Sequence, residues 1–282
     1  MGKDIGDILS KSVHELKEYL HTQESDIPDK LLRALAADPR KTARQLGDLI
    51  QRRRLRNLRE EERLSHLLHF EQDLYQQGYR LIAGVDEAGV APLAGPVVAA
   101  AVILPQNYKL PGLNDSKKIL NHEKREMLAR RIKQDALCWA TGSAEVEEID
   151  RLNVYRSGLL AMKRAVEGLA PEPEYVLVDA RTIPHCPIPQ KAIVRGDALC
   201  AAIAAASLVA KTTRDLHMLE LDRVYPGYGF ADHKGYPTPG HLEILKQRGP
   251  LPVHRKSFAP VRDALAQDPA QQDLFAVNPS EG

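Results

Sequence analysis

From residue 80 onward, short apolar runs alternate with segments that have the spacing of amphipathic helices. Runs at 81–89, 96–104 and 175–180 are rich in Val, Ala and Ile and are bounded by Gly, Pro or acidic residues. Runs of this kind are typical of strands that are buried on both faces. The segments at 122–136 and 153–169 predict helices between them. This alternation constrains the chain to an α/β fold built on a sheet.

The same patterns predict the other elements of this region. Two shorter strands are expected at 138–146 and 191–195, and a short helix near 239–247. Residues 197–225 predict one long helix, whose Ala-rich first half must pack closely against another element. The last residues, 266–282, carry acids but no bases and have little periodicity, which predicts a disordered tail.

Residues 1–78 have no strand pattern and predict an all-helical extension. Ser12 with Glu15 has the spacing of a capping box at the start of a helix. The Asp-Pro pair at 38–39 predicts the start of another helix. That helix extends to the end of the extension, and Gly47 with the charged stretch beyond it predicts a break or two helices.

The stretch RRRLRNLR at 52–59 concentrates five arginines. Three glutamates follow it at once, at 60–62, so the simpler interpretation is a solvated helix face. A nucleic-acid contact is the alternative.

The overall composition excludes several classes of protein. Lys and Arg total 39 against 38 Asp and Glu, so the net charge of +1 does not support nucleic-acid binding by bulk charge. No apolar run reaches the roughly 20 residues of a membrane helix, and the first residues lack the apolar core of a secretory signal. Three cysteines without C-x-x-C spacing argue against a disulfide framework or a zinc ribbon. A reducing cytoplasm is the expected location, with no membrane contact.

Four acidic residues lie where a purely structural role is hard to explain: Asp86, Glu87, Asp179 and Asp197. The first three end apolar strands, and Asp197 opens the Ala-rich helix, where it is also well explained as an N-cap. One such acid is usually a cap or an ion-pair partner. Several at the ends of separate strands, without a matching buried base, indicate a site for Mg²⁺ or Mn²⁺. Two such ions about 3.5–4 Å apart can activate water for phosphodiester hydrolysis.

A geometric condition accompanies this hypothesis. Neighbouring residues of a regular strand point to opposite faces of the sheet. Asp86 and Glu87 can therefore serve one site only if their strand ends or distorts, and we expect it to do so at these two residues.

Basic and hydroxyl residues accompany the acids and fit a phosphate-bearing substrate. Ser116, Lys117 and Lys118 lie on one loop, and Arg195 comes shortly before the fourth acid. Each alone is explained as a surface residue, but together they place cations beside carboxylates that would otherwise repel a polyanion. Tyr236 can stack on a sugar or base, or simply pack its own loop.

Other polar residues have a weaker signal. His185, His233, His241 and His254 lack the spacing of zinc ligands. We interpret each as a loop or surface residue, with a proton shuttle as the alternative. Arg255 and Lys256 add cations near the carboxyl end.

Eight blocks of sequence follow one another over residues 80–262. They are GVDEAG (84–89), PLAGPVVAAAVIL (92–104), LNDSKK (113–118), YVLVDA (175–180), GDA (196–198), AAAS–AKTTRD (204–215), YGFADHKGYPT (228–238) and HRKSFAPV (254–261). In this order they resemble ribonuclease HII, and agreement over so many blocks is highly specific. Residues 1–78 more weakly resemble the amino-terminal extension of some bacterial members.

The resemblance implies a ribonuclease H-like fold over 79–265, with a mixed five-stranded sheet flanked by helices and a helical carboxyl-terminal region. It implies an endonuclease that cuts the RNA strand of RNA–DNA hybrids and cuts 5′ of a single ribonucleotide in duplex DNA. The products would carry 3′-hydroxyl and 5′-phosphate ends, and the protein is expected to be a monomer.

The resemblance also assigns roles to residues. Asp86, Glu87, Asp179 and Asp197 match the four catalytic acids that bind metal. Lys117 and its neighbours match the phosphate-binding loop. Tyr236 matches the tyrosine that stacks on the deoxyribose after the ribonucleotide.

One segment departs from the family pattern. Members usually have Gly-Arg-Gly where this chain has Gly89, Val90 and Ala91, and in the family the backbone of that tripeptide contacts the ribose 2′-hydroxyl. Val90 removes a guanidinium, and Ala91 adds a Cβ where a close approach or a positive φ is expected. Arg195 stands where the family prefers Lys. Ribonuclease HIII also lacks the arginine, but the PLAGPV block and the extension favour the HII branch.

Three hypotheses follow. The main one is a metal-dependent endoribonuclease of the ribonuclease HII type that acts in genome maintenance. The second is a nucleic-acid-binding relative that keeps the fold but cleaves or recognises the RNA–DNA junction weakly, because of its 89–91 segment. The third is a metal-dependent nuclease with another substrate, such as plain DNA.

Overall fold

The structure is a computed structural model that describes residues 5–22 and 27–266. Two units make up the chain, Met1–Arg63 and Leu64–Gly282. The predicted disordered tail lies outside the described residues, apart from Ala266, which ends the last helix. Within the described residues, no helix has both the length and the apolar character needed to cross a membrane.

The first unit is helical, as predicted. Its helices are α1 (Ile5–Leu9), α2 (Val13–Thr22), α3 (Asp29–Ala36) and the first part of α4 (Lys41–Leu67). The predicted capping box at the start of α2 is present, because Ser12 N–H donates to Glu15 at 2.9 Å and Ser12 Oγ accepts from Glu15 N–H at 3.3 Å. The core consists of buried apolar side chains from α1 to α4: Ile8, Leu16, Leu20, Ile27, Leu31, Leu35 and Ala43.

Helix α4 begins two residues later than the Asp-Pro pair predicted. The Asp38 carboxylate instead accepts hydrogen bonds from the backbone and guanidinium of Arg40. In the arginine-rich stretch, Arg54 pairs with Asp29 at 2.6 Å. The other four, Arg52, Arg53, Arg56 and Arg59, are exposed, as expected for a solvated face.

The predicted division into two helices is confirmed, but α4 continues through Gly47 and the arginine-rich stretch, and the break lies at Leu68. There α4 ends and α5 (His69–Gln76) begins. Leu64, Leu67, Leu68 and Leu74 flank the break and are buried in the core of the second unit. The apolar side chains therefore fix where the chain turns, since both helices must direct leucines into one core.

Strand β1 (Ile82–Ala88) lies at the centre of the sheet. The others are β2 (Val97–Ile103), β3 (Cys138–Ala144), β4 (Tyr175–Asp179) and β5 (Gln190–Ile193), in the order β3-β2-β1-β4-β5. Pairing is antiparallel among β1, β2 and β3, and parallel among β1, β4 and β5. The predicted mixed five-stranded sheet is confirmed, with each strand boundary within two residues of its predicted place.

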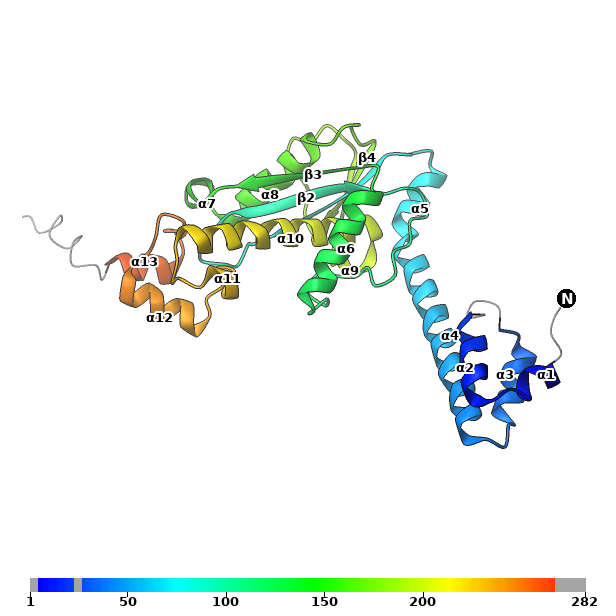
Figure 1. Cartoon of the computed structure of the whole chain (residues 1–282). Coiled ribbons are helices and arrows are strands. Elements are labelled where there is room, and N and C mark those ends of the chain that lie inside the picture. Colours follow the sequence, from blue (N-terminus) through cyan, green and yellow to red (C-terminus); the bar gives the residue numbers. More distant parts are fainter. Residues whose placement is uncertain (1–4, 23–26, 267–282) are drawn as a thin grey trace, which may run out of the picture. The chain divides into compact units, whose positions relative to one another are not determined.

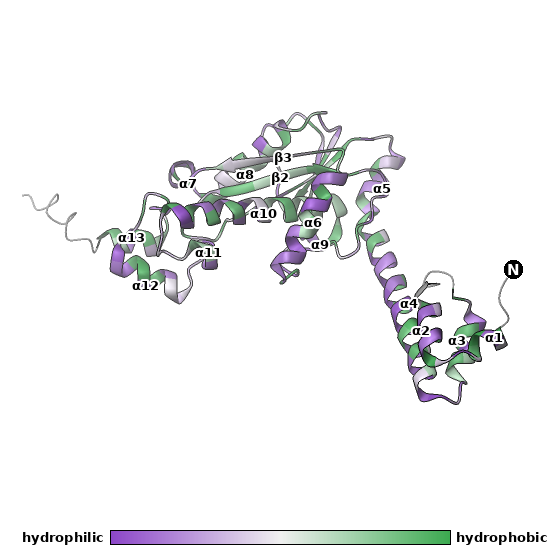
Figure 2. Cartoon of the chain, viewed as in Figure 1, coloured by the Kyte–Doolittle hydropathy of each residue, from purple (hydrophilic) through white to green (hydrophobic). Residues whose placement is uncertain are grey.

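Helices cover both faces of this sheet (Figure 1). The expected helices are α6 (His122–Asp135), α8 (Val154–Glu167) and α12 (Pro239–Arg248). Three short helices in this unit are not predicted by the sequence patterns: α7 (Val146–Leu152), α11 (Phe230–His233) and α13 (Ala259–Ala266). Strand β2 is buried throughout, and Figure 2 shows it coloured as hydrophobic, in contrast to the largely hydrophilic α4.

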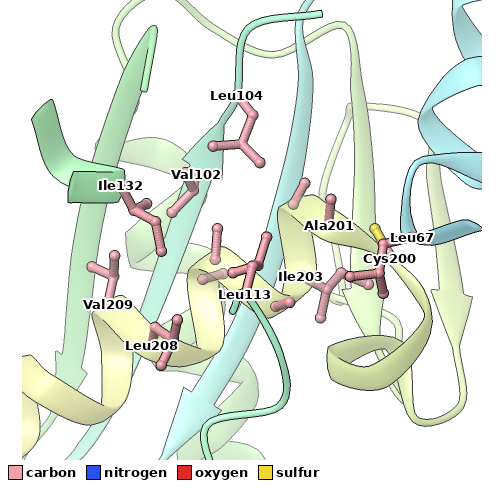
Figure 3. Close-up of a cluster of buried hydrophobic side chains, with 14 of the residues drawn as sticks. Leu67, Val102, Leu104, Leu113, Ile132, Cys200, Ala201, Ile203, Leu208 and Val209 are labelled. Carbon is pink, nitrogen blue, oxygen red and sulfur yellow. The ribbon is translucent and has the colours of Figure 1, made fainter. Parts of the chain in front are cut away.

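The two faces have separate cores. Residues of β1 alternate between them, because Ile82 belongs to the cluster on one face and Ala83 and Val85 to the cluster on the other. Figure 3 shows part of the first cluster, where Leu208 and Val209 lie with side chains of β2 and α6.

The predicted long helix at 197–225 is interrupted. Helix α9 (Gly196–Leu199) ends before Cys200, whose φ of −133° and ψ of 129° are extended, and α10 (Ala201–Val224) follows. Ala-rich composition indicates a helix but does not locate a bend held by contacts from elsewhere in the chain. The predicted close packing is confirmed, because a Cβ on Gly84 of β1 would lie 2.1 Å from the Ala202 carbonyl carbon.

Gly84→Ala is therefore expected to lower the free energy of unfolding by about 2–4 kcal/mol, since the added methyl meets backbone rather than a flexible side chain. Urea denaturation measures this loss. Gly240→Ala is the matched control, because a Cβ there meets nothing within 4 Å and helix propensity favours Ala. Equal stability of both variants would contradict the close approach of α10 to β1.

Candidate active site

Two of the predicted acids lie on adjoining parallel strands, Asp86 within β1 and Asp179 at the end of β4. Strands β1 and β4 run parallel and pair up to Val85 and Val178, so Asp86 and Asp179 are the next residue on each. Asp86 is buried, with 5% of its surface exposed. Burial raises its pKa well above the usual range, and the nearby charges of Glu87 and Asp179 raise it further. A hydrogen bond from Ser207 opposes these effects.

Glu87 lies on the other face of the sheet. Strand β1 keeps regular pairing with β2 through Ala88, so it neither ends nor distorts at the two acids, contrary to expectation. Glu87 Oε1 lies 3.1 Å from Nη1 of Arg181, whose guanidinium covers the ring of Tyr155 on α8. Burial raises the pKa of Glu87, whereas Arg181 lowers it.

Helix α9 brings together the third and fourth acids, Asp179 and Asp197. Asp179 Oδ1 accepts a hydrogen bond from Gly196 N–H at 2.7 Å. Asp197 is buried in the first turn of this helix. Burial, Asp115 and Asp179 raise its pKa, while Lys117, with Nζ 3.7 Å from Oδ2, lowers it.

The N-cap explanation of Asp197 is wrong. The N-cap of α9 is Arg195, in the left-handed conformation with φ of 60°. Asp197 is the second residue of the helix, and its side chain interacts with the other acids and Lys117. Nothing about helix capping therefore accounts for a carboxylate at this position.

The four carboxylates fit a hard cation by their chemistry. They supply oxygen donors only, three of them have raised pKa values, and Glu87 Oε2 is buried without a hydrogen-bond partner. As placed, no group of three His, Cys, Asp or Glu side chains within residues 5–22 and 27–266 is arranged to hold a metal ion. Protein donors engage all four carboxylates instead. Asp86 accepts from Glu87 N–H at 2.7 Å. The other three acids interact with Arg181, Gly196 N–H and Lys117.

The predicted phosphate loop is partly assembled beside the acids. Ser116 is buried, with its hydroxyl 2.8 Å from the Ser207 hydroxyl on α10. Burial lowers the pKa of Lys117, but Asp197, Asp86 and other carboxylates raise it by more. Lys118 and Arg195 are exposed, and among the described residues neither pairs with the four acids.

Two buried arginines hold the loop that follows β1. Arg214 on α10 donates to the carbonyls of Ala94, Pro96 and Lys234. Arg255 donates to the carbonyls of Gly89, Val90 and Gly95. Both side chains are fully buried. The carbonyls of this loop therefore point inward to fixed positive charges.

These contacts determine the conformation of residues 89–91, the segment that departs from the family pattern. Gly89 has φ of +91°, and a Cβ there would lie 2.0 Å from Arg214 Nε, so glycine is required. Val90 is partly buried and packs on the α8-side core. Ala91 is exposed and is not among the residues with positive φ, so the expectation of a positive φ at Ala91 is wrong.

Tyr236 lies half-exposed in the loop after α11, with Lys211 Nζ 5.8 Å from its ring centroid. Beneath it, Leu251 N–H donates to His254 Nδ1 at 2.9 Å, and the Nε2 atoms of His254 and His241 are 3.1 Å apart. His241 Nδ1 lies 2.9 Å from the Tyr236 carbonyl. His254 must then donate to His241, and His241 to Tyr236, with both rings neutral.

The interpretation of the histidines as surface or loop residues is wrong for His241, which lies inside α12, and His254 lies in a loop but not at the surface. His241 and His254 are fully buried, and burial lowers the pKa of both, that of His254 to about 4. His185 is exposed, as expected. His233 is partly buried and stacks on His241, with ring centroids 4.1 Å apart.

Sequence reasoning missed several residues of the site. Ser207, Lys211 and Arg214 lie on one face of α10 at helical spacing. The AKTTRD block contains two of them, but a basic residue in a helix gives no sign that it is buried. The sequence predicts Arg255 as one of several cations near the acids but not as a buried residue, and Arg181 follows the third acid by two positions.

Comparisons with known proteins agree with this arrangement. A family model described as "Ribonuclease HII" matches residues 83–261, and one described as "Ribonuclease HII N-terminal domain" matches 12–75. A "Ribonuclease HII" of Myxococcus xanthus is 57% identical over 279 residues, covering 97% of this chain and 95% of its own. Another, of Anaeromyxobacter, is 54% identical over 273 residues, covering 97% and 86%.

Solved structures have the same fold. The ribonuclease H2 of Pyrococcus horikoshii aligns with a TM-score of 0.55 at 26% identity, covering 65% of this chain and 96% of its own. The Bst ribonuclease HIII, solved with Mn²⁺, aligns with a TM-score of 0.50 at 24% identity, covering 68% and 71%, which is evidence of the fold alone. This chain belongs to the ribonuclease HII family, whose members are endoribonucleases of the ribonuclease H type.

Proposed function

We propose that this chain cuts the RNA strand of RNA–DNA hybrids and cuts 5′ of single ribonucleotides in duplex DNA, leaving 3′-hydroxyl and 5′-phosphate ends. The observation that carries the proposal is the convergence of Asp86, Asp179 and Asp197 beside Glu87 and Lys117. Burial, and secondarily repulsion by neighbouring carboxylates, raises the pKa values of Asp86, Glu87 and Asp197, and such a cluster supports a site that attracts cations.

Asp86, Glu87, Asp179 and Asp197 would hold Mg²⁺ or Mn²⁺, and two ions suit this reaction class. Bound there, the metal would activate water and stabilise the leaving oxygen. Because β1 is regular through Ala88, Glu87 can take part only if its side chain leaves Arg181 and the strand distorts at this residue. Its unpartnered Oε2 and its raised pKa both favour that exchange.

The residues around the acids would bind the nucleic acid. Lys117 faces the cluster and would hold the phosphate near the cut. Ser116 anchors that loop to α10, and exposed Lys118 and Arg195 would contact phosphates further along. Tyr236 would stack on the sugar after the ribonucleotide.

The segment 89–91 would recognise the ribose 2′-hydroxyl through its backbone. Arg255 binds the carbonyls of Gly89 and Val90, and the backbone N–H groups of 89–91 would then face the substrate. This argument disfavours the alternative of a weakened nucleic-acid-binding relative, since the loop conformation depends on the buried arginines and Gly89 rather than on the side chains of Val90 and Ala91.

We also propose that the chain acts as a cytoplasmic monomer, with a helical extension over 1–78 and a catalytic domain over 79–265. The three cysteines are free, which is consistent with a reducing compartment.

The test is cleavage in Mg²⁺ and in Mn²⁺ of three labelled duplexes: an RNA–DNA hybrid, DNA with one ribonucleotide, and all-DNA. We expect cuts in the first two only, with the single-ribonucleotide duplex cut on its 5′ side. Failure to cut either would refute the proposal. Cutting of the all-DNA duplex would instead favour a nuclease of broader substrate range.

Asp86→Asn should lower cleavage by at least about a thousandfold, because a proposed metal ligand loses its charge. The same change should raise stability in metal-free buffer at pH 8. The folded pKa of Asp86 lies above its unfolded value, so the ionised carboxylate costs stability once the pH exceeds about 4. The gain should therefore shrink as the pH falls toward 4.

Urea denaturation across this pH range measures the effect. Glu148→Gln is the control of opposite sign, because hydrogen bonds from Arg164 lower the pKa of Glu148. That variant should lose stability at pH 8, and the loss should shrink as the pH falls below about 4.5. A destabilised Asp86→Asn protein at pH 8 would show that the carboxylate is not strained in the metal-free fold.

A Val90→Arg/Ala91→Gly variant restores the family tripeptide and tests the role of the loop backbone. We expect kcat/KM on the single-ribonucleotide duplex to stay within about threefold of the parent, because the buried arginines already set the loop. Arg255→Lys should lose far more, since one ammonium cannot replace the guanidinium fork. A gain of a hundredfold or more in the first variant would show that the side chains govern recognition.

A further inference from the structure

Glu71 of α5 is a buried acid that the proposed chemistry does not use. Only 4% of its surface is exposed. Its Oε1 accepts hydrogen bonds from Ala202 N–H at 2.8 Å and from Cys200 Sγ at 3.3 Å. Oε2 is buried without a hydrogen-bond partner. These donors lie about 130 positions away in sequence, at the start of α10.

The first N–H groups of helix α10 require a hydrogen-bond acceptor from elsewhere in the chain. The helix is 24 residues long, and Ala201, Ala202 and Ile203 at its start are buried, so water does not reach their N–H groups. The N-cap residue, Cys200, makes no side-chain capping bond. The positive end of the helix dipole is thus buried, and a carboxylate is the group that satisfies it best.

The short helix that carries Asp197 lies between two such bonds. At its start, Gly196 N–H donates to Asp179. Just beyond its end, Ala202 N–H donates to Glu71. Cys200, whose extended backbone joins α9 to α10, also donates from its Sγ to Glu71. Fixing both sides of a four-residue helix fixes the direction of its Asp197 side chain.

We propose that Glu71 is a positioning residue for Asp197, acting as an N-cap for α10 supplied from another helix. The proposal rests on the proposed function of the acid cluster. It also gives an indirect part in the active site to the end of the region matched by the amino-terminal-domain model, which reaches residue 75. An apolar residue at this position would pack as well, so a buried carboxyl group with two hydrogen-bond donors indicates a polar role.

Glu71→Ala should lower kcat about tenfold while KM for the hybrid stays within about twofold, because the substrate contacts lie elsewhere. Amide hydrogen exchange over 196–204, measured without metal, should become faster. Glu71→Gln keeps an acceptor at Oε1, so it should lose only about two- to threefold in kcat and serves if the alanine variant folds poorly.

Rescue separates capping from packing. Cys200 already has the extended φ and ψ of an N-cap, and Ser is a preferred capping residue. Glu71→Ala/Cys200→Ser should therefore recover most of the lost kcat and slow the exchange again. Leu74→Ala is the matched control, since it loosens the packing of α5 but leaves the carboxylate in place. It should leave kcat within about twofold.

Each outcome decides the proposal. If Glu71→Ala leaves both kcat and exchange over 196–204 unchanged, the positioning role is refuted. If Leu74→Ala matches the effect of Glu71→Ala, or Cys200→Ser gives no recovery, the carboxylate only packs. An inactive parent protein would refute the proposed function instead, and the exchange measurement would still show whether Glu71 holds α9.

Discussion

The close approach of α10 to β1 is the constraint on which the rest of the second unit depends. At Gly84 the helix backbone lies where a side chain would otherwise be, and this contact places one face of α10 directly over the strand ends. Ser207 then reaches Asp86, Lys211 lies near the ring of Tyr236, and Arg214 reaches the loop after β1. If α10 lay further from the sheet, these side chains would be too short to reach Asp86, Tyr236 and the loop after β1.

Buried charge is distributed unevenly around this helix. Carboxylates gather on β1 and β4, where burial and repulsion by its neighbours raise the pKa of Asp86. Two guanidinium groups lie beside the loop 89–96 and bind its backbone carbonyls. The first group is costly in the absence of cations and the second is well satisfied. One part of the site is thus poised to bind ions, and the neighbouring part is rigid before any substrate arrives.

Much of this fold follows from sequence because apolar runs report burial directly. All five strands and the helices at 122–135 and 154–167 were predictable in this way. The bend at Cys200 was not, since it depends on Glu71, a residue from a distant helix. The buried His241, His254 and Arg255 were missed for the same reason: polar residues are placed inside by partners that only the fold brings together. The acids were the opposite case, because a carboxylate after an apolar strand is visible as an anomaly in the sequence itself.

The two buried histidines under Tyr236 form a hydrogen-bond chain with a direction. It runs from the Leu251 amide through His254 and His241 to the Tyr236 carbonyl. A proton added to either ring would set two N–H groups against each other or against the Leu251 amide, so the chain tolerates only neutral histidines. Their lowered pKa values mean that the fold binds fewer protons here than the unfolded chain does. The support of the tyrosine is therefore complete above about pH 6.5 and weakens progressively as acidity increases toward pH 4.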